Sequence, residues 1–335
     1  MAKGRIRSAI KKKIRGSRAK PAATPKAPGK PKTGARRLKS ATVRVMRRIG
    51  TVKSAIESMD AQLKLQRFNI KKFAPKIKIA VEKGHYTVKT VETPEELEEV
   101  LKLRFDVFNR EYMQTRRAVG VDVDKLDFIC DHLVIRDNRA ARIVGTYRLN
   151  SSTFSDKFYS SSEFHFDQIK NMPGNILELG RAAIDKEYRT GVVIALLWRG
   201  ISEYMLKTNT DILLGCASVK TMEPLEIGLV TYHLEKKGIL KFNLEVEPTR
   251  KYKVKTLKKV LDYIEKNPFE YNEAAVTEMI PALFASYIKM GFKAYGEPAI
   301  DRDFNCIDFL IMIHLNELEG SYKRRYNDKS KLKDT

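Results

Sequence analysis

One apolar run of the sequence contains a glutamate and an arginine three positions apart. The run LELGRAAI spans residues 177–184 and carries Glu178 and Arg181. Residues three apart in a strand point to opposite faces of the sheet, so these two ionisable side chains need different partners. One interpretation is a buried salt bridge to a neighbouring strand. The other is a general base in a cleft, where partial burial raises the pKa of the carboxyl group.

A basic turn follows this run and leads into a second apolar run. Arg189, Thr190, Gly191, Val192 and Val193 occupy the junction. If a strand ends before the turn and a helix begins after it, the free N–H groups and the positive dipole end of the helix suit a phosphate. Gly191 would let the backbone approach that anion, although a glycine at such a junction is also ordinary turn chemistry.

Hydrophobic periodicity predicts the elements that position these residues. Alternating runs predict strands and helical spacing predicts helices, which together form a mixed α/β domain from about residue 85. The expected strands are 85–91, 132–137, 141–150, 175–184, 211–218 and 306–315, and the expected helices are 93–113, 191–206 and 274–290. The strands at 132–137 and 141–150 are expected to pair as a hairpin.

Charge separates a basic N-terminal tail from the rest of the 335 residues. Residues 1–50 contain 18 of the 64 Lys and Arg residues and none of the 41 Asp and Glu residues. We expect a disordered tail at 1–40, an amphipathic helical segment at 41–75, a domain at 85–318 with a variable, Lys-rich and irregular insertion at 220–272, and a basic tail at 319–335.

The basic tail has several interpretations. It can be a solvated appendage, or residues 1–60 can bind an anionic membrane surface or an acidic partner. The tail contains no aromatic residue that could stack on a base, which disfavours nucleic acid as the partner.

The cysteines and the hydropathy exclude two classes of protein. Cys130, Cys216 and Cys306 are far apart and form no CxxC pair, so a disulfide framework or zinc site is not expected and a reducing compartment fits best. No run of 18 or more apolar residues predicts a membrane-spanning helix. We expect a cytoplasmic protein that can associate peripherally with the inner face of the membrane.

Many ordered blocks of the sequence resemble the GNAT acyltransferase superfamily. The blocks are LRFDVF (103–108), VDVDKLDFICDHLVI (121–135), IVGTYRL (143–149), FYSSSEF (158–164), LELGRAAIDKEYR (177–189), IALLWRGISEY (194–204), GCAS (215–218) and GEPAIDRDFNCIDFLIM (296–312). Within the superfamily the chain is most similar to the acyl-carrier-protein-dependent branch, which includes the ornithine-lipid N-acyltransferases (L-ornithine N-alpha-acyltransferases), the N-acyl amino acid synthases and, more distantly, the acyl-homoserine-lactone synthases. The order and spacing of the blocks favour the ornithine-lipid type.

The resemblance implies a fold and an activity. The fold would be a mixed, mostly antiparallel central sheet flanked by helices. The enzyme would transfer a long-chain, 3-hydroxylated acyl group from acyl carrier protein to the amino group of an amino acid, ornithine first, in aminolipid synthesis. It would need no metal and no cofactor, because the 4′-phosphopantetheine thioester on the carrier protein is itself the substrate, with a coenzyme A thioester as the alternative donor. The single glycine of the phosphate turn, Gly191, departs from the usual Q/R-x-x-G-x-G/A pattern and favours the carrier protein.

The resemblance also assigns roles on the donor side. Glu178 would be the base that accepts the proton of the amine, directly or through a water. Backbone N–H groups near Leu179 and Gly180 would polarise the thioester carbonyl. The turn at residues 189–193 would hold the pantetheine phosphate.

On the acceptor side several residues remain open. One of Arg104, Arg148 and Arg181 would bind the carboxylate of the amino acid, for which a guanidinium has the right geometry. Asp124 and Asp127 would lie near the acceptor, or in a solvated turn. The alternatives are a synthase with another acceptor (glycine, tyrosine or lysine), including a signal-molecule synthase, and a non-enzymatic protein of the same fold that docks through its basic tail on a membrane or on nucleic acid.

Three further motifs carry little weight. His132 and Asp137 resemble an O-acyltransferase His-x-x-x-x-Asp motif, but residues five apart in a strand face opposite ways, which would separate the pair. Asp122, Asp124 and Asp127 are spaced like the start of a calcium loop whose glycine and terminal glutamate are missing. Tyr232 is a weakly supported general acid, and a thiolate leaves without one.

Overall fold

The computed structural model describes residues 69–113 and 120–317. The predicted tails at 1–40 and 319–335 lie outside these residues, as does all of the predicted 41–75 helix except its last residues, 69–75. Among those, Ile70 and Phe73 are buried against the helix at 94–105. The folded body therefore includes residues that precede position 85.

A nine-stranded mixed sheet forms the centre of this body. Its strands, in spatial order, are β1 (Ala80–Lys83), β2 (Tyr86–Thr90), β3 (Asp131–Asp137), β4 (Arg142–Ser151), β6 (Asn175–Ile184), β7 (Thr210–Val219), β11 (Cys306–His314), β10 (Lys293–Asp301) and β8 (Leu240–Lys241). Only the β6–β7 and β10–β8 pairs are parallel. The predicted hairpin is confirmed as the antiparallel pair β3–β4. A small second sheet pairs β5 (Phe164–His165) with β9 (Glu247–Pro248).

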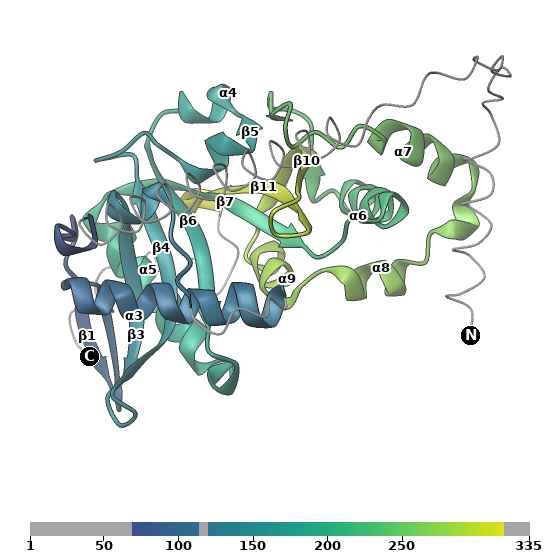
Figure 1. Cartoon of the computed structure of the whole chain (residues 1–335). Coiled ribbons are helices and arrows are strands. Elements are labelled where there is room, and N and C mark those ends of the chain that lie inside the picture. Colours follow the sequence, from purple (N-terminus) through teal and green to yellow (C-terminus); the bar gives the residue numbers. More distant parts are fainter. Residues whose placement is uncertain (1–68, 114–119, 318–335) are drawn as a thin grey trace, which may run out of the picture. The chain divides into compact units, whose positions relative to one another are not determined.

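Helices cover both faces of the sheet, as the fold class requires. Along β3, Leu133 and Ile135 pack in one cluster with α5 (Val192–Lys207), whereas Val134 between them packs in another with α3 (Pro94–Phe105). Successive strand residues point to opposite faces, so α3 and α5 lie on opposite sides of the sheet. Figure 1 shows α3 crossing the near face of β3 and β4, with α5 behind them.

The start of α3 follows the sequence signals. The Thr93 side chain accepts a hydrogen bond from the Glu96 N–H group, and Pro94 takes the first helical position. The helix continues as a π-helical stretch from Asp106 to Tyr112.

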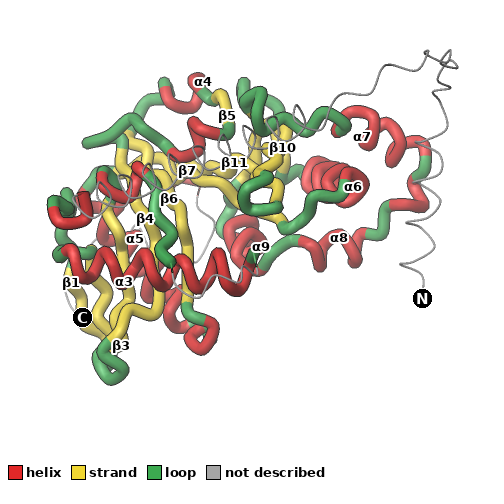
Figure 2. Tube along the Cα trace, viewed as in Figure 1, coloured by secondary structure: helices red, strands yellow, loops and turns green. Residues whose placement is uncertain are grey.

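Two expectations for the C-terminal half were wrong. The stretch 220–272 is not irregular, because it contains α6 (Pro224–Lys236) and α7 (Leu257–Lys266). The expected helix at 274–290 is two helices, α8 (Glu273–Met279) and α9 (Ala282–Lys289), because Pro281 cannot continue a helix that precedes it. Figure 2 shows α6, α7 and α8 grouped to the right of β10, and α6 contacts α7, α8 and β8. A four-residue helix, α4 (Asp167–Lys170), and short 3-10 turns complete the described structure.

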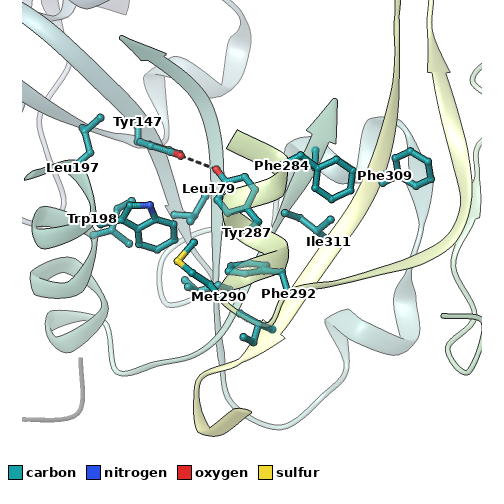
Figure 3. Close-up of a cluster of buried hydrophobic side chains, with 14 of the residues drawn as sticks. Tyr147, Leu179, Leu197, Trp198, Phe284, Tyr287, Met290, Phe292, Phe309 and Ile311 are labelled. Carbon is teal, nitrogen blue, oxygen red and sulfur yellow. Dashed lines mark hydrogen bonds between the residues drawn. The ribbon is translucent and has the colours of Figure 1, made fainter. Parts of the chain in front are cut away.

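The largest hydrophobic cluster fills the face of the sheet that α5 and α9 cover. Trp198 of α5 meets Tyr287 of α9 edge to face, and the hydroxyl group of Tyr287 lies 2.6 Å from that of Tyr147 on β4 (Figure 3). Phe284 packs beside Phe309 of β11. Trp198 is therefore a packing residue, as the sequence indicates.

The central strands separate in the middle of the sheet. The parallel pairing of β6 with β7 extends from Asn175 to Glu178, where it ends opposite Leu214. Beyond this point β6 pairs only with β4, through a bulge between Gly180 and Ala183. Arg181 sits in this bulge with a φ of 50°, a left-handed conformation that is strained for an arginine. A bulge re-aims side chains, and Arg181 is re-aimed here, three residues after Glu178.

Candidate active site

A cavity of about 260 Å³ lies where β6 and β7 separate. Five residues of the β6 segment from Glu178 to Ala182 line it, together with residues from β4, β7, β10, β11 and α9. Its volume is near the lower end of the range for small-molecule sites, roughly 300–1,000 Å³. The structure thus brings together Glu178, Leu179, Gly180, Arg148 and Arg181, five of the predicted site residues.

The cavity has two chemically different sides. Tyr147, Leu179, Ala217, Phe284 and Tyr287 belong to the hydrophobic cluster on the α5 face and form an apolar side. Strand alternation places the neighbouring residues on the other face, and these are polar. They are Arg148 on β4, Glu178 on β6, Ser218 on β7 and Asp308 on β11. An acyl thioester suits the apolar side, and a charged acceptor suits the polar side.

Glu178 is buried and holds three hydrogen bonds from one short turn. Its Oε1 accepts from the Ser160 N–H group (2.8 Å) and hydroxyl group (2.6 Å), and its Oε2 accepts from the Tyr159 N–H group (2.7 Å). Burial raises the pKa of Glu178, and these hydrogen bonds oppose the rise. Glu178 nevertheless lines the cavity. Its hydrogen bonds therefore hold the turn at residues 159–160 while the residue can still contact a substrate.

Three arginines and three aspartates form a network beside Glu178. Arg104 contacts Asp122 (2.5 Å) and Asp127 (2.6 Å), and its side chain is 0% exposed. Arg148 contacts Asp124 (2.8 Å) and Asp127 (2.9 Å). The pKa of Asp127 would be raised by burial alone, but the two arginines outweigh this and hold it well below its usual value.

Arg181 completes the network and differs from the other two arginines. Its Nη2 donates to Asp124 Oδ2 at 3.0 Å, whereas its Nε lies 3.8 Å from Asp122 Oδ2, an ion pair that is too long for a hydrogen bond. Its guanidinium carbon lies 5.3 Å from the ring centre of Tyr159, 5.0 Å from that of Phe304 and 6.0 Å from that of Phe108. The aromatic rings hold the guanidinium in place, and its Nε–H, which makes no hydrogen bond, can donate to an anionic ligand group.

The three candidate arginines are thus separated by their surroundings. Arg148 and Arg181 line the cavity, whereas the guanidinium of Arg104 is enclosed by aspartates away from its wall. Asp124 and Asp127 also lie off the cavity wall and bind the arginines that line it. In this geometry the aspartates orient the arginines, and their oxygens are engaged by guanidinium groups instead of a calcium ion.

The basic turn after β6 does not line the cavity. Arg189 folds back, and its guanidinium donates to the Ile184 carbonyl (Nε, 3.0 Å) and to Glu111 (2.9 Å). Gly191 precedes the first residue of α5 with a φ of 91°, and its side-chain position faces open space. No side-chain hydrogen bond caps this helix, and Val192 is exposed. The first turn of α5 is therefore open to an external acceptor such as a phosphate.

A second set of polar residues on the cavity was missed by the sequence reasoning. Asp301 and Cys306 line the wall beside Asp308, and their ligand atoms all lie within 4.8 Å of one another, close enough to hold a cation. Glu163 is buried behind them. The available signal was an aspartate at position 308 inside the otherwise apolar strand CIDFLIM, which parallels the glutamate in LELGRAAI.

The weaker motifs have structural roles. His132 is buried on β3, where its Nε2 lies 2.9 Å from the Asp127 carbonyl oxygen, and burial lowers its pKa to about 4. Asp137, at the other end of the strand, accepts from Tyr188 and two turn N–H groups. The predicted separation of this pair is confirmed. Tyr232 meets the ring of Tyr271 and is not on the cavity wall. No helix in the described ranges is long and apolar enough to cross a membrane.

Comparisons with known proteins agree with the sequence resemblance. Residues 103–199 match the model of the acetyltransferase (GNAT) domain. The chain is 30% identical to the L-ornithine N(alpha)-acyltransferase of Rhizobium meliloti (strain 1021) over 216 residues, 61% of this chain and 70% of the relative. It is 27% identical to the enzyme of the same name from Brucella abortus (strain 2308) over 259 residues, 72% and 89% of the two chains.

A solved structure is also similar. It is that of FeeM, an N-acyl amino acid synthase from uncultured soil microbes, with 11% identity, a TM-score of 0.35, and coverage of 72% of this chain and 93% of that one.

Proposed function

The chain belongs to the L-ornithine N(alpha)-acyltransferase family and is an acyltransferase of the GNAT fold, and from that premise we propose that it acylates the α-amino group of ornithine. The observation that carries the proposal is the cavity at the β6–β7 separation, where an apolar side meets a side with two arginines and buried carboxyl groups. A thioester and an amino acid can approach one another there from opposite faces of the sheet.

The proposed reaction forms one bond and breaks one. The neutral α-amino nitrogen attacks the thioester carbonyl carbon, a C–N bond forms, the C–S bond breaks, and the sulfur leaves as a thiolate that takes up a proton. Glu178 accepts the proton that the amine loses, directly or through a water. Its three hydrogen bonds to residues 159–160 fix the carboxylate at the cavity wall. Positioning the two reactants supplies much of the remaining acceleration.

The donor is bound, in this proposal, along β6 and the start of α5. Backbone N–H groups near Leu179 and Gly180 polarise the carbonyl oxygen as negative charge develops on it. The turn from Arg189 to Val193 binds the phosphate of the pantetheine arm, which fits the uncapped helix start. We propose acyl carrier protein as the carrier and a long 3-hydroxyacyl chain as the group transferred, with a coenzyme A thioester as the alternative donor.

The carboxylate of the amino acid is proposed to bind Arg181, with Arg148 beside it. The side chain of Arg181 is 14% exposed and its Nε–H makes no hydrogen bond, although Asp122 lies 3.8 Å away, whereas the 4% exposed side chain of Arg148 is enclosed by Asp124, Asp127 and the ring of Tyr159. Because the aspartates neutralise most of the positive charge, the network orients a single anionic group and does not attract several.

Thiol release from purified protein tests the proposal. Release from 3-hydroxyacyl carrier protein is measured with ornithine, glycine, tyrosine, lysine and polyamines, and is repeated with the matching coenzyme A thioester. Ornithine-stimulated release supports the proposal. Stimulation by a different amino acid alone would assign another acceptor to the same chemistry, and the absence of amine-stimulated release would remove the proposed reaction.

We also propose that residues 1–60 bind an anionic membrane surface, where the lipid product would be released. Support comes from the 18 basic residues and the absence of acidic residues in positions 1–50. Binding to vesicles of anionic lipid is expected to fall with added salt and with removal of residues 1–60. Salt-insensitive binding would contradict this electrostatic explanation.

A further inference from the structure

Two carboxyl groups, those of Asp301 and Asp308, line the cavity that Arg181 also lines, and a third, that of Glu163, is their buried neighbour. Asp308 of β11 accepts hydrogen bonds from the Ser218 hydroxyl group and, at 3.8 Å, from the Cys306 thiol. Asp301 of β10 accepts hydrogen bonds through Oδ1 from the N–H groups of residues 303 (2.7 Å) and 304 (3.1 Å). Both aspartates are buried and both line the cavity.

This carboxyl cluster (Glu163, Asp301 and Asp308) has no basic partner in residues 69–113 and 120–317. No Lys, Arg or His of these ranges forms an ion pair with any of its three members, in contrast to the arginine–aspartate network, where every charge is matched. Lys220 donates to the Tyr112 carbonyl oxygen instead, at 2.6 Å. Buried carboxyl groups without a counter-ion are costly, so the site is suited to a cation that comes from outside the protein.

Glu163 supplies an independent sign of a missing ligand group. Its side chain is 0% exposed, and among the described residues neither carboxyl oxygen has a donor at hydrogen-bond distance and angle, although Tyr159 and the Asp308 carboxyl group are its polar neighbours. Burial and the neighbouring Asp308 raise its pKa to about 9, and burial likewise raises the pKa of Asp308 to about 6. The two carboxyl groups therefore resist being charged at the same time, and a cation at the cavity wall would stabilise their charged forms.

We propose that Asp308, with Asp301 beside it and Glu163 behind it, is the subsite that binds the side-chain ammonium of a diamino acid acceptor. The carboxyl cluster and the Arg181 guanidinium lie on the wall of one cavity, as a substrate with an anionic and a distal cationic end requires. This inference rests on the proposed function, because it assigns the second amino group of the acceptor. It predicts selection of diamino acids over amino acids with neutral side chains.

The test compares ornithine with norvaline, which has the same carbon chain without the terminal amino group. For the wild-type chain, kcat/KM with ornithine is expected to exceed that with norvaline by about 10- to 100-fold, as for the loss of a hydrogen-bonded charged group. Asp308→Asn is expected to reduce the ratio to within about threefold of one. Asp303→Asn, which changes an exposed acid of the same loop, is expected to keep the wild-type ratio.

The outcomes separate this inference from the proposed function. The ratio within one preparation does not depend on how much of a variant folds, and Asp301→Asn provides a second variant of the same wall. Equal turnover of ornithine and norvaline, or an unchanged ratio in Asp308→Asn, would overturn the subsite and leave amino-acid acylation standing. A preference that disappears with a chelator and returns with added Mg²⁺ or Zn²⁺ would overturn it in favour of a metal site. Turnover of neither amino acid would overturn both the subsite and the proposed function.

Discussion

Ser160 donates both its N–H group and its hydroxyl group to one oxygen of Glu178, at 2.8 and 2.6 Å. The relationship ties the turn at Tyr159–Ser162 to β6 at the residue where β6 leaves β7. It gives Glu178 two separable contributions, one to the shape of the cavity and one to proton transfer.

Two substitutions separate these contributions. Glu178→Gln is expected to lower kcat by about 100-fold or more, because an amide cannot accept the proton of the amine. Ser160→Ala keeps the carboxylate and removes one donor, so it is expected to lower stability by about 1 kcal/mol and to lower kcat far less. Steady-state rates and urea unfolding of both variants check the comparison. Equal losses of rate in the two variants would reduce Glu178 to a structural residue.

The pH dependence of the rate follows from the direction of the Glu178 pKa shift. A base must be deprotonated, and burial raises its pKa, so kcat/KM is expected to fall as the pH drops through a value above the ordinary one of about 4.3. The same profile with Ser160→Ala should have its acidic limb at a higher pH, because the lost hydrogen bond had favoured the charged form. An acidic limb that does not move would argue that another group titrates.

Arg181 and Arg104 are expected to fail in different ways when each is replaced by lysine. Arg181→Lys loses the planar donor group held among three aromatic rings, so the KM for the amino acid should rise by about 10-fold or more. Arg104→Lys breaks two buried contacts with aspartates and should cost about 3–5 kcal/mol of stability. Saturation curves and unfolding midpoints distinguish the two. If the KM for the amino acid rises only in Arg104→Lys, then Arg104, and not Arg181, binds the carboxylate of the acceptor.

Gly191 and Gly84 form a matched pair for the phosphate turn. Both have positive φ and open space where a side chain would be placed, so Gly→Ala at either position should cost about 1 kcal/mol through backbone strain alone. Only Gly191→Ala is expected to raise the KM for the acyl donor, because Gly84 lies in the turn between β1 and β2. The KM for the amino acid should stay constant in both. If the KM for the acyl donor is the same in the two variants, the phosphate is not bound at the turn of residues 189–193.

Glu163 makes the stability of the protein depend on pH. Its pKa is about 9 in the folded chain against an ordinary 4.5, so the folded state binds the proton more tightly. The stability gained from this proton is complete below about pH 4.5 and is lost as the pH rises towards 9. Glu163→Gln has no group that titrates at this position. As the pH rises through this window, its free energy of unfolding should therefore increase relative to that of the wild-type chain by on the order of 1 kcal/mol per pH unit.

Unfolding free energies at pH 5.5 and pH 8.5 measure this effect. Glu245→Gln, which changes an exposed glutamate, should keep the wild-type dependence. A difference between wild type and Glu163→Gln that is the same at both pH values would show that the buried carboxyl group does not titrate in this range.

The local patterns of the sequence predicted six of the nine strands of the main sheet and missed β1, β8 and β10. The run 175–184 is β6 to the residue, because this apolar run ends at a charged turn. Likewise, the Thr-Pro-Glu-Glu start of α3 fixed its cap. The break at Pro281 was missed because apolar spacing continues across it. Helix α6 was missed although residues 227, 230 and 234 form a helical stripe that is buried in the core, because the surrounding stretch 220–272 was judged by its lysine content as a whole.

The charged site could be predicted only in part. Glu178 and Arg181 are visible as charges in an apolar strand, but which arginine reaches the cavity depends on aspartates about 20 to 60 positions away in sequence. No local pattern encodes such contacts. Asp308, like Glu178, is an acidic residue inside an apolar strand, but the sequence pattern around it indicates only a strand. Its meaning depends on Glu163 and Asp301, which the sheet brings together from separate segments.

The proposed acylation of ornithine is tested most directly by the product that purified protein forms from ornithine and 3-hydroxyacyl carrier protein, identified by tandem mass spectrometry. We expect a single amide on the α-nitrogen of ornithine, with the free carrier-protein thiol released in equal amount. Both products should be lost in Glu178→Gln. An amide on the side-chain nitrogen would reverse the assigned orientation of the acceptor. The absence of any ornithine-dependent amide, with either carrier protein or coenzyme A as donor, would contradict the proposed function itself.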